Sequence, residues 1–169
     1  MDPKEILAFF CRRRSVRRFQ KKALPDETLT LLMKAAMAAP SGNNAQPWEF
    51  VVVRDPKIKA DLSRVHTWVS MAAEAAAAIV VLGDKGSKWW ADDCAAATEN
   101  LLLAAANLGL GTVWCGIKEN DAQAVRKILG VPERLGVLCI VAIGYPAEAP
   151  PPHTKYRKDK VHWDRFTQS

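Results

Sequence analysis

Two segments contain residue types whose spacing suits ligand binding. The first reads RRRSVRR over residues 12–18, where a hydroxyl stands among five guanidinium groups with no acidic residue to neutralise them. Planar, forked guanidinium donors suit phosphate, and a phosphate monoester would relieve their mutual repulsion. Charge alone favours a simpler interpretation, in which the run is a solvated basic turn or a nucleic-acid-binding arm.

The second segment reads PSGNNAQPW over residues 40–48. Its short polar side chains, Ser41, Asn43, Asn44 and Gln46, can hydrogen-bond a heteroaromatic edge or a polyol chain, and the tryptophan at its end can pack beneath such a ligand. A plain connecting loop with Asx turns accounts equally well for these residues.

Further along the chain, Lys155 and Arg157 fall on one side of an extended segment, which suits a phosphate clamp.

The usual protein-borne catalytic motifs are missing: the sequence has no His-Glu-x-x-His, no Gly-x-Ser-x-Gly and no Gly-x-x-x-x-Gly-Lys. The spacing of His66, His153 and His162 indicates no shared metal, so we expect no metal site.

The charge distribution emphasises the two ends of the chain. The 169 residues carry 24 Lys and Arg against 18 Asp and Glu. Residues 12–22 hold seven basic and no acidic residues, and residues 153–169 hold five and two, which leaves 12 basic against 16 acidic residues elsewhere. Both ends are therefore expected to bind an anionic ligand or partner.

An apolar content of 49% fits an ordinary globular domain and excludes the disordered and fibrous classes.

A cytoplasmic location is expected from the N-terminus and the cysteines. The first eleven residues are too charged, and their apolar run too short, for a signal peptide. The charge-free run at residues 100–117 is broken by two glycines, which favours a helix followed by a strand over a membrane span. Cys11, Cys94, Cys115 and Cys139 form no close pair, which fits a reducing compartment.

Periodicity and turn signals divide the chain into alternating elements. Helices are predicted at residues 3–10, 26–39, 56–65, 68–77, 91–108 and 120–129, and strands at 48–53, 78–82, 111–117 and 136–143. This alternation predicts one layered domain of the α+β or α/β class. Prolines open the last 25 residues, yet Tyr156, Trp163 and Phe166 follow as apolar anchors, so we expect an extended tail that docks on its own domain or on a partner subunit.

In this order the segments resemble the nitroreductase family of FMN-dependent oxidoreductases. The matching pieces are RRRSVRRF, AAPSGNNAQPWEFVVV, the helix–strand unit DCAAATENLLLAAANLGLGTVWCGI and the PHTKYR tail, which together span nearly the whole chain. The resemblance implies one α+β domain over residues 1–169, in which helices flank a central, mostly antiparallel sheet in three layers. It also implies an intertwined homodimer with FMN at the subunit interface, in which residues 145–169 form an extended tail docked on the partner subunit.

The resemblance assigns cofactor-binding roles in all four pieces. The residues so implied are Arg13, Arg14, Ser15, Arg17, Pro40, Ser41, Asn43, Asn44, Gln46, Trp114, Cys115, Gly116, Lys155 and Arg157. The N-terminal set would surround the phosphate, ribityl chain and pyrimidine edge, with Arg17 stabilising the reduced ring. The loop set would reach the flavin of the second subunit, the 114–116 backbone would face the ring, and the tail pair would close on the phosphate.

The implied activity is a ping-pong oxidoreductase reaction, in which hydride passes from NADH or NADPH to the flavin and electrons then pass to a small organic acceptor such as a nitroaromatic or a quinone. On this interpretation no side chain is a nucleophile or an obligatory acid. Cys115 is expected to be a small buried residue rather than a redox catalyst. Trp68, Trp89 and Trp90 are candidates either for the wall of the substrate space or for the core or an interface.

The chain departs from the resemblance in being short for the family. The segment that covers the substrate side of the flavin is reduced to about residues 65–90 and contains no recognisable selectivity motif. The resemblance implies neither nucleic acid nor membrane as a partner. Two alternative functions are a flavin-binding sensor without turnover and a basic nucleic-acid-binding domain.

Overall fold

A computed structural model describes residues 2–167, in which five α-helices and four β-strands are joined by three short 3₁₀-helices. In chain order these are α1 (Pro3–Arg12), α2 (Asp26–Met37), η1 (Gly42–Asn44), β1 (Trp48–Val53), α3 (Pro56–Ser63), η2 (Thr67–Ala73), β2 (Ala77–Asp84), α4 (Trp90–Asn107), β3 (Gly111–Gly116), α5 (Glu119–Leu129), β4 (Leu135–Gly144) and η3 (Lys158–Lys160). The four predicted strands and five of the predicted helices are confirmed to within two residues.

The helix predicted at residues 68–77 is wrong, because this segment forms the 3₁₀-helix η2 and then enters β2. Val69 and Ala72 are the buried residues of η2, and their spacing of three residues matches the period of a 3₁₀-helix. Alanine-rich composition indicated α-helix, but packing of this three-residue repeat against the core overrides that weak propensity.

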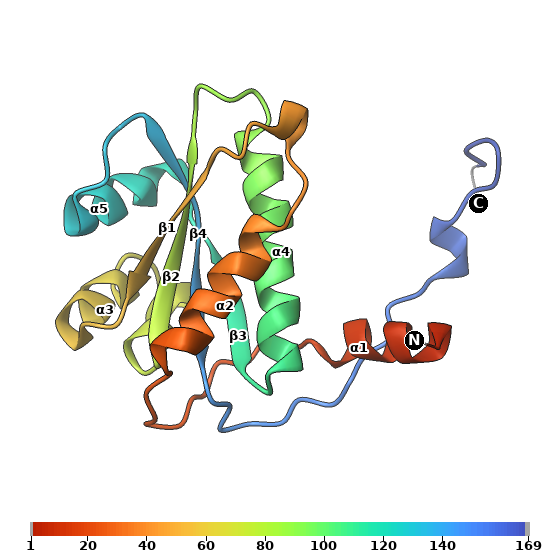
Figure 1. Ribbon diagram of the computed structural model, residues 1–169, viewed down its shortest axis with the longest axis horizontal. Coiled ribbons are helices and arrows are strands. Elements are labelled where there is room, and N and C mark those ends of the chain that lie inside the picture. Colours follow the sequence, from red (N-terminus) through yellow and green to blue (C-terminus); the bar gives the residue numbers. More distant parts are fainter. Residues whose placement is uncertain (1, 168–169) are drawn as a thin grey trace.

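The strands form one sheet in the order β1-β2-β4-β3, and every neighbouring pair is antiparallel. Figure 1 shows α2 and α4 on one face of this sheet and α3 and α5 on the other. The expected three-layer α+β fold with a mostly antiparallel sheet is therefore confirmed.

The two central strands contribute side chains to both layers of the core. In β2, Val80 and Leu82 pack with the apolar residues beneath α3 and α5, whereas Ile79 and Val81 pack with those of α2 and α4. Alternate residues of a strand point to opposite faces, so a strand covered on both faces is apolar at nearly every position. Burial on both faces accounts for the nearly continuous apolar sequence of β2 and β4.

Two glycines of the sheet make room for the side chain of Trp90, the first residue of α4. Gly83 and Gly136 are register partners in β2 and β4. A Cβ atom on Gly83 would lie 2.7 Å from the indole of Trp90, and one on Gly136 would lie 2.4 Å from it. The missing side chains thus leave a notch that the indole fills, which fixes where the N-terminal end of α4 rests.

The two basic ends of the chain lie side by side near the edge of β3. The backbone N–H of Val16 donates to the carbonyl of Thr112 in β3 at 2.9 Å. Phe19 forms an antiparallel bridge with Pro146, and further backbone hydrogen bonds continue this pairing as far as residue 153. Beyond that point the tail runs past α1 and away from the sheet (Figure 1). Among the described residues, no helix has the length and apolar character needed to cross a membrane.

Gly136→Ala is expected to lower the free energy of unfolding by about 2 kcal/mol, because the added methyl group overlaps the indole of Trp90. Trp90→Leu removes the indole atoms involved, so the two substitutions should be less costly together than their separate effects predict, by about 1 kcal/mol. Urea unfolding of the wild type, both single variants and the double variant measures this coupling. Strictly additive effects would show that Gly136 does not shape the seat of the indole.

Candidate functional site

Side chains from both basic ends gather around His153. Burial lowers the pKa of its imidazole, and the positive charges of Lys155, Arg14 and Arg13 lower it further. The two ring nitrogens are shielded from solvent, and neither has a hydrogen-bond partner among residues 2–167. Clustered positive charge beside an unpaired polar ring fits an anion with several acceptor oxygens, such as a phosphate.

A carboxylate in the tail organises the backbone of this region. Glu148 accepts hydrogen bonds from the backbone N–H groups of Arg17, at 2.6 Å, and Arg18, at 3.3 Å. These bonds hold the pKa of the Glu148 carboxyl below its usual range. Arg14 meanwhile donates to the carbonyl of Pro151. The carboxylate of Glu148 is therefore bonded to backbone N–H groups rather than to guanidinium groups. Arg13 Nε lies 3.6 Å from Glu99 Oε1, in a partly exposed ion pair that offsets only part of the positive charge of this region.

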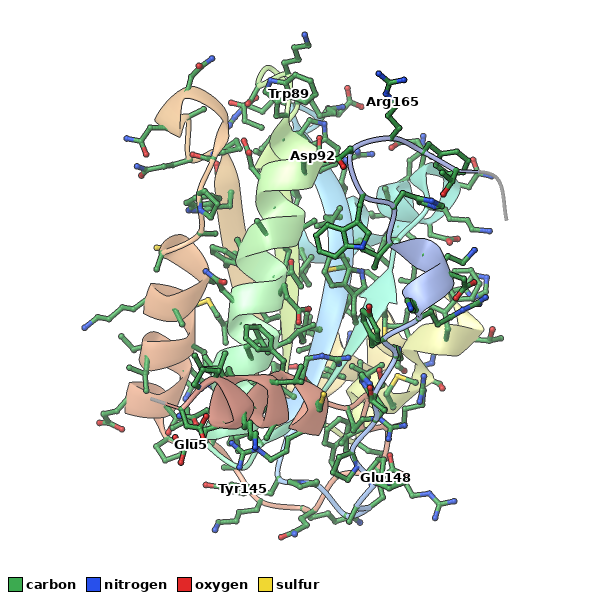
Figure 2. All side chains as sticks on the ribbon, turned by 90° about the vertical axis from the view of Figure 1, so that its right-hand side faces the viewer. Glu5, Trp89, Asp92, Tyr145, Glu148 and Arg165 are labelled. Carbon is green, nitrogen blue, oxygen red and sulfur yellow. The ribbon has the colours of Figure 1, made fainter. Side chains whose placement is uncertain are left out.

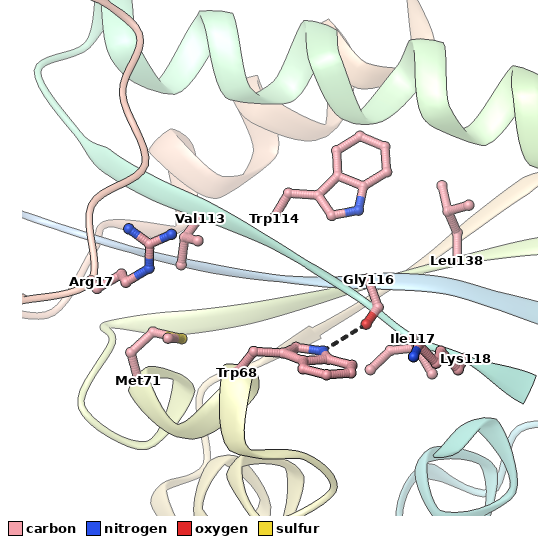
Figure 3. Close-up of a pocket in the computed structure, with 9 residues that line it drawn as sticks. All are labelled: Arg17, Trp68, Met71, Val113, Trp114, Gly116, Ile117, Lys118 and Leu138. Atoms are coloured by element: carbon pink, nitrogen blue, oxygen red, sulfur yellow. Dashed lines mark hydrogen bonds between the residues drawn. The ribbon is translucent and has the colours of Figure 1, made fainter. Parts of the chain in front are cut away.

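A cavity of about 460 Å³ opens beside the end of β3. Its lining residues are Arg17, Trp68, Met71, Val113, Trp114, Gly116, Ile117, Lys118 and Leu138, with no carboxylate among them. Figure 3 shows Arg17 and Lys118 at opposite ends, with Met71 and Trp68 between them. Cavities of a few hundred Å³ with apolar walls and a few convergent polar groups are typical of sites for planar organic ligands.

Trp68 occupies a defined place in this cavity. Its Nε1 donates to the carbonyl of Gly116 at 2.9 Å (Figure 3). The imidazole of His66 stacks on the indole with ring centroids 3.1 Å apart, and Lys118 Nζ lies 5.4 Å from the ring centroid. The indole is thus held by a hydrogen bond, a stacked ring and a cation, although it remains 38% exposed.

The loop at residues 40–46 is strained and rigidly held. Asn43, Asn44 and Gln46 adopt φ of 52°, 55° and 48°, in the left-handed region, which asparagine tolerates but glutamine rarely enters. The Ser41 hydroxyl accepts from the backbone N–H of Gln46 at 3.0 Å, and the Asp93 carboxylate accepts from Gly42 N–H at 2.9 Å. Such strain is characteristic of functional segments, because the surrounding structure must maintain it.

This loop and the basic ends lie far apart within one chain. Gly42 packs against Trp89 at the N-terminal end of α4, and Figure 2 shows Trp89 at one end of the molecule and Glu148 near the other. The structure therefore divides the implied cofactor-binding residues into two groups, one in the loop and one around the basic ends and the cavity.

The implied residues differ in what their side chains and backbone contact. Arg13, Arg14 and Lys155 gather at His153, and Arg17, Trp114 and Gly116 line the cavity. Ser15 bridges to β3 through its backbone, and Pro40 is exposed at the start of the loop. Arg157 is paired within the tail, where its Nη2 lies 2.6 Å from Asp159 Oδ2.

Cys115 is 2% exposed, as expected for a small buried residue. Burial raises the pKa of its thiol to about 11, although the positive charge of Arg17 opposes this rise. A thiol reacts as its thiolate, so Cys115 is unreactive near neutral pH. Of the three tryptophans, Trp68 lines the cavity, Trp90 fills the notch in the sheet, and Trp89 packs on the loop.

The sequence interpretation assigned no ligand role to His153, Lys118 or Asp93. His153 lies within the PHTKYR motif, so its position was the available signal. Lys118 directly follows the flavin-facing stretch, but a lysine after a strand carries no specific pattern. Asp93 is 6% exposed, and its Oδ2 has no partner among the described residues. Helical spacing alone gave no indication that this carboxylate supports the loop.

Comparisons with known proteins cover most of the chain. The model of the nitroreductase family matches residues 11–68 and 63–145. A protein of Archaeoglobus fulgidus called "Putative NADH dehydrogenase/NAD(P)H nitroreductase" is 40% identical over 96% of this chain and 99% of its own. A crystal structure of that name from Bacteroides thetaiotaomicron has a TM-score of 0.93 at 38% identity, covering 96% and 98%. An FMN-dependent nitroreductase from Clostridium difficile has a TM-score of 0.90 at 31% identity, covering 95% and 99%.

Thiol labelling tests the burial of Cys115. Near pH 8, a thiol reagent such as DTNB should modify Cys11, which is only partly buried, well before the buried Cys94, Cys115 and Cys139. Because burial raises the pKa of Cys115, its labelling should become fast only as the pH approaches 11. Mass spectrometry of quenched samples identifies the labelled positions. Rapid labelling of Cys115 at pH 8 in the native protein would contradict its assignment as an inert core residue.

Proposed function

Because this chain belongs to the nitroreductase family, we propose that it works as an FMN-dependent oxidoreductase, reducing a small organic acceptor such as a nitroaromatic or a quinone with NADH or NADPH. The observation that carries this function is the cavity beside β3, which has Arg17 at one end. Arg17 belongs to the same basic segment as Arg13 and Arg14, which lie in the cationic cluster at His153. An elongated ligand with a planar ring and a phosphate ester matches both features.

The residues present fit FMN. Arg13, Arg14, His153 and Lys155 would hold the phosphate, since they supply donors and positive charge that no carboxylate fully neutralises. The cavity beside β3 would hold the ring. When bound, FMN supplies the hydride acceptance and electron transfer that the side chains lack.

The chain itself would bind and orient FMN and exclude water from the ring. Arg17, at one end of the cavity, would face the pyrimidine edge of the ring, where a fixed positive charge stabilises the negative charge that reduction brings. Met71, Val113 and Leu138 form apolar walls that limit the access of water. Gly116 has no side chain and lets a ring approach the strand closely. Arg157 would contribute to phosphate binding only after leaving Asp159.

We further propose that a complete site needs two copies of the chain. The loop bearing Asn43 and Asn44 is exposed, yet none of its residues lines the cavity of its own chain. A second copy would allow this loop to reach a flavin held by the partner's cavity. The separation of the two groups of implied residues supports this arrangement.

The exposed apolar residues at both ends of the chain support the same dimer. None of the residues of α1 is buried, and Leu7 and Phe10 are 65% and 49% exposed. In the tail, Trp163 is 82% exposed and Phe166 is 77% exposed. Apolar surface of this extent is expected to pack against another surface. We propose that residues 154–167 dock on the partner subunit, whereas residues 145–153 pair with their own chain.

We also propose a cytoplasmic location, which the four free cysteines support.

Anaerobic reduction tests the function and the role of Arg17. The FMN-loaded protein should bleach near 450 nm with NADH or NADPH and regain its colour when a quinone is added, where 450 nm is about the band expected of any bound flavin. Arg17→Gln should slow the reduction at least about tenfold, because a charge that stabilises the reduced ring is lost. Lys34→Gln removes an exposed charge from α2, outside the cavity and both basic segments, and is the control. A flavin that stays oxidised with both donors would instead indicate a sensor without turnover.

The assembly has its own test in solution. Sedimentation of the FMN-loaded protein should give a dimer with one flavin per chain, because each site would draw on both copies. Removal of residues 154–169 should shift the protein toward monomer and weaken flavin binding. Asn43→Ala should weaken flavin binding without dissociating the dimer. A flavin-loaded monomer with native activity would contradict the two-chain site.

A further inference from the structure

Lys118 is a second cation of the cavity, and it lies outside both basic ends of the chain. Arg17 belongs to the basic segment that also carries Arg14, and it lies at one end of the cavity, whereas Lys118 lies at the other (Figure 3). Among residues 2–167, no carboxylate lies within ion-pair distance of Lys118. The neighbouring Glu119 is instead directed to Arg126, with 3.4 Å between Oε1 and Nη2.

Trp68 provides a prepared flat surface beside this cation. Its hydrogen bond to the Gly116 carbonyl and its stacking on His66 fix the orientation of the indole. Lys118 Nζ lies 5.4 Å from the centre of the same ring. A rigid aromatic wall costs little conformational entropy when a planar ligand stacks on it. The wall and the cation together can therefore recognise a planar ring that bears a negative charge.

On the basis of the function proposed above, we infer that Trp68 and Lys118 select planar electron acceptors that carry a carboxylate or another anionic substituent. The acceptor would share the cavity with the flavin ring, with its own ring against Trp68 and its anionic group paired with Lys118. The absence of carboxylates from the lining of the cavity removes competition for this pairing. A neutral acceptor of the same shape would gain only the stacking contact, so the charge would decide between otherwise similar substrates.

A pair of acceptors that differ in charge alone tests this inference. Suitable compounds are 4-nitrophenylacetate and 4-nitrophenylacetamide, because a methylene group insulates the nitro group from the change. The FMN-loaded protein is reduced with dithionite under anaerobic conditions and mixed with each compound, so that the result does not depend on NADH or NADPH. The wild type should be reoxidised by the carboxylate about tenfold more efficiently, the ratio expected of one partly shielded ion pair. This preference should shrink as salt is raised.

Variants assign the preference to the two residues. Lys118→Gln should bring the ratio of carboxylate to amide close to one, whereas Lys127→Gln removes one exposed charge from α5 and should leave the ratio unchanged. Trp68→Leu should lower reoxidation by both compounds, and Trp68→Phe should restore part of it. Flavin content and thermal unfolding confirm that each variant is folded. If Lys118→Gln does not fold, Lys118→Met and the salt series on the wild type replace it.

The outcomes separate this inference from the function on which it rests. Equal reoxidation by the two compounds in the wild type, or a preference that persists in Lys118→Gln, would overturn the selection of anionic acceptors and leave the oxidoreductase function intact. A reduced protein that passes electrons to neither compound nor to any quinone would overturn both.

Discussion

The pairing of residues 11–20 with residues 145–153 is the interaction on which the site depends. It is anchored to the sheet because Val16 bonds to Thr112 in β3. The pairing forces two basic segments together, while Glu148, the acidic residue that lies between them, is bonded to backbone N–H groups. Positive charges brought together in this way repel one another, so the pairing is most stable when an anion binds. The backbone pairing would therefore favour binding of an anion by the two basic segments.

The rest of the domain places the cavity beside β3 next to the basic segment that carries Arg17. Trp90 in its notch fixes the start of α4, and Asp93, one turn further on, holds Gly42 of the strained loop. The same helix then leads to β3, whose end forms the wall of the cavity. The helix α4 therefore connects the loop held by Asp93 to β3, whose residues line the cavity. In a two-chain assembly, the two halves of each site would be positioned by two copies of one helix.

Most of the fold could be predicted from the sequence, because its signals are local. The apolar run at β1 and the helix-stop glycines before β3 each act within a few residues, and their bounds were correct within two residues. The 3₁₀-helix η2 was missed because its three-residue repeat is set by packing. In the site, the basic runs were visible, but their proximity depends on backbone pairing across more than 100 residues of sequence. The pairing of Arg157 with Asp159 and the isolation of Lys118 are likewise matters of side-chain geometry.

The proposed function requires that the two basic ends together bind the phosphate of FMN. The most direct measurement compares the affinity of the cofactor-free protein for FMN and for riboflavin, which lacks the phosphate, by quenching of flavin fluorescence. The account predicts that FMN binds at least about 100-fold more tightly, with the difference decreasing at high salt. Equal affinities for FMN and riboflavin would contradict it.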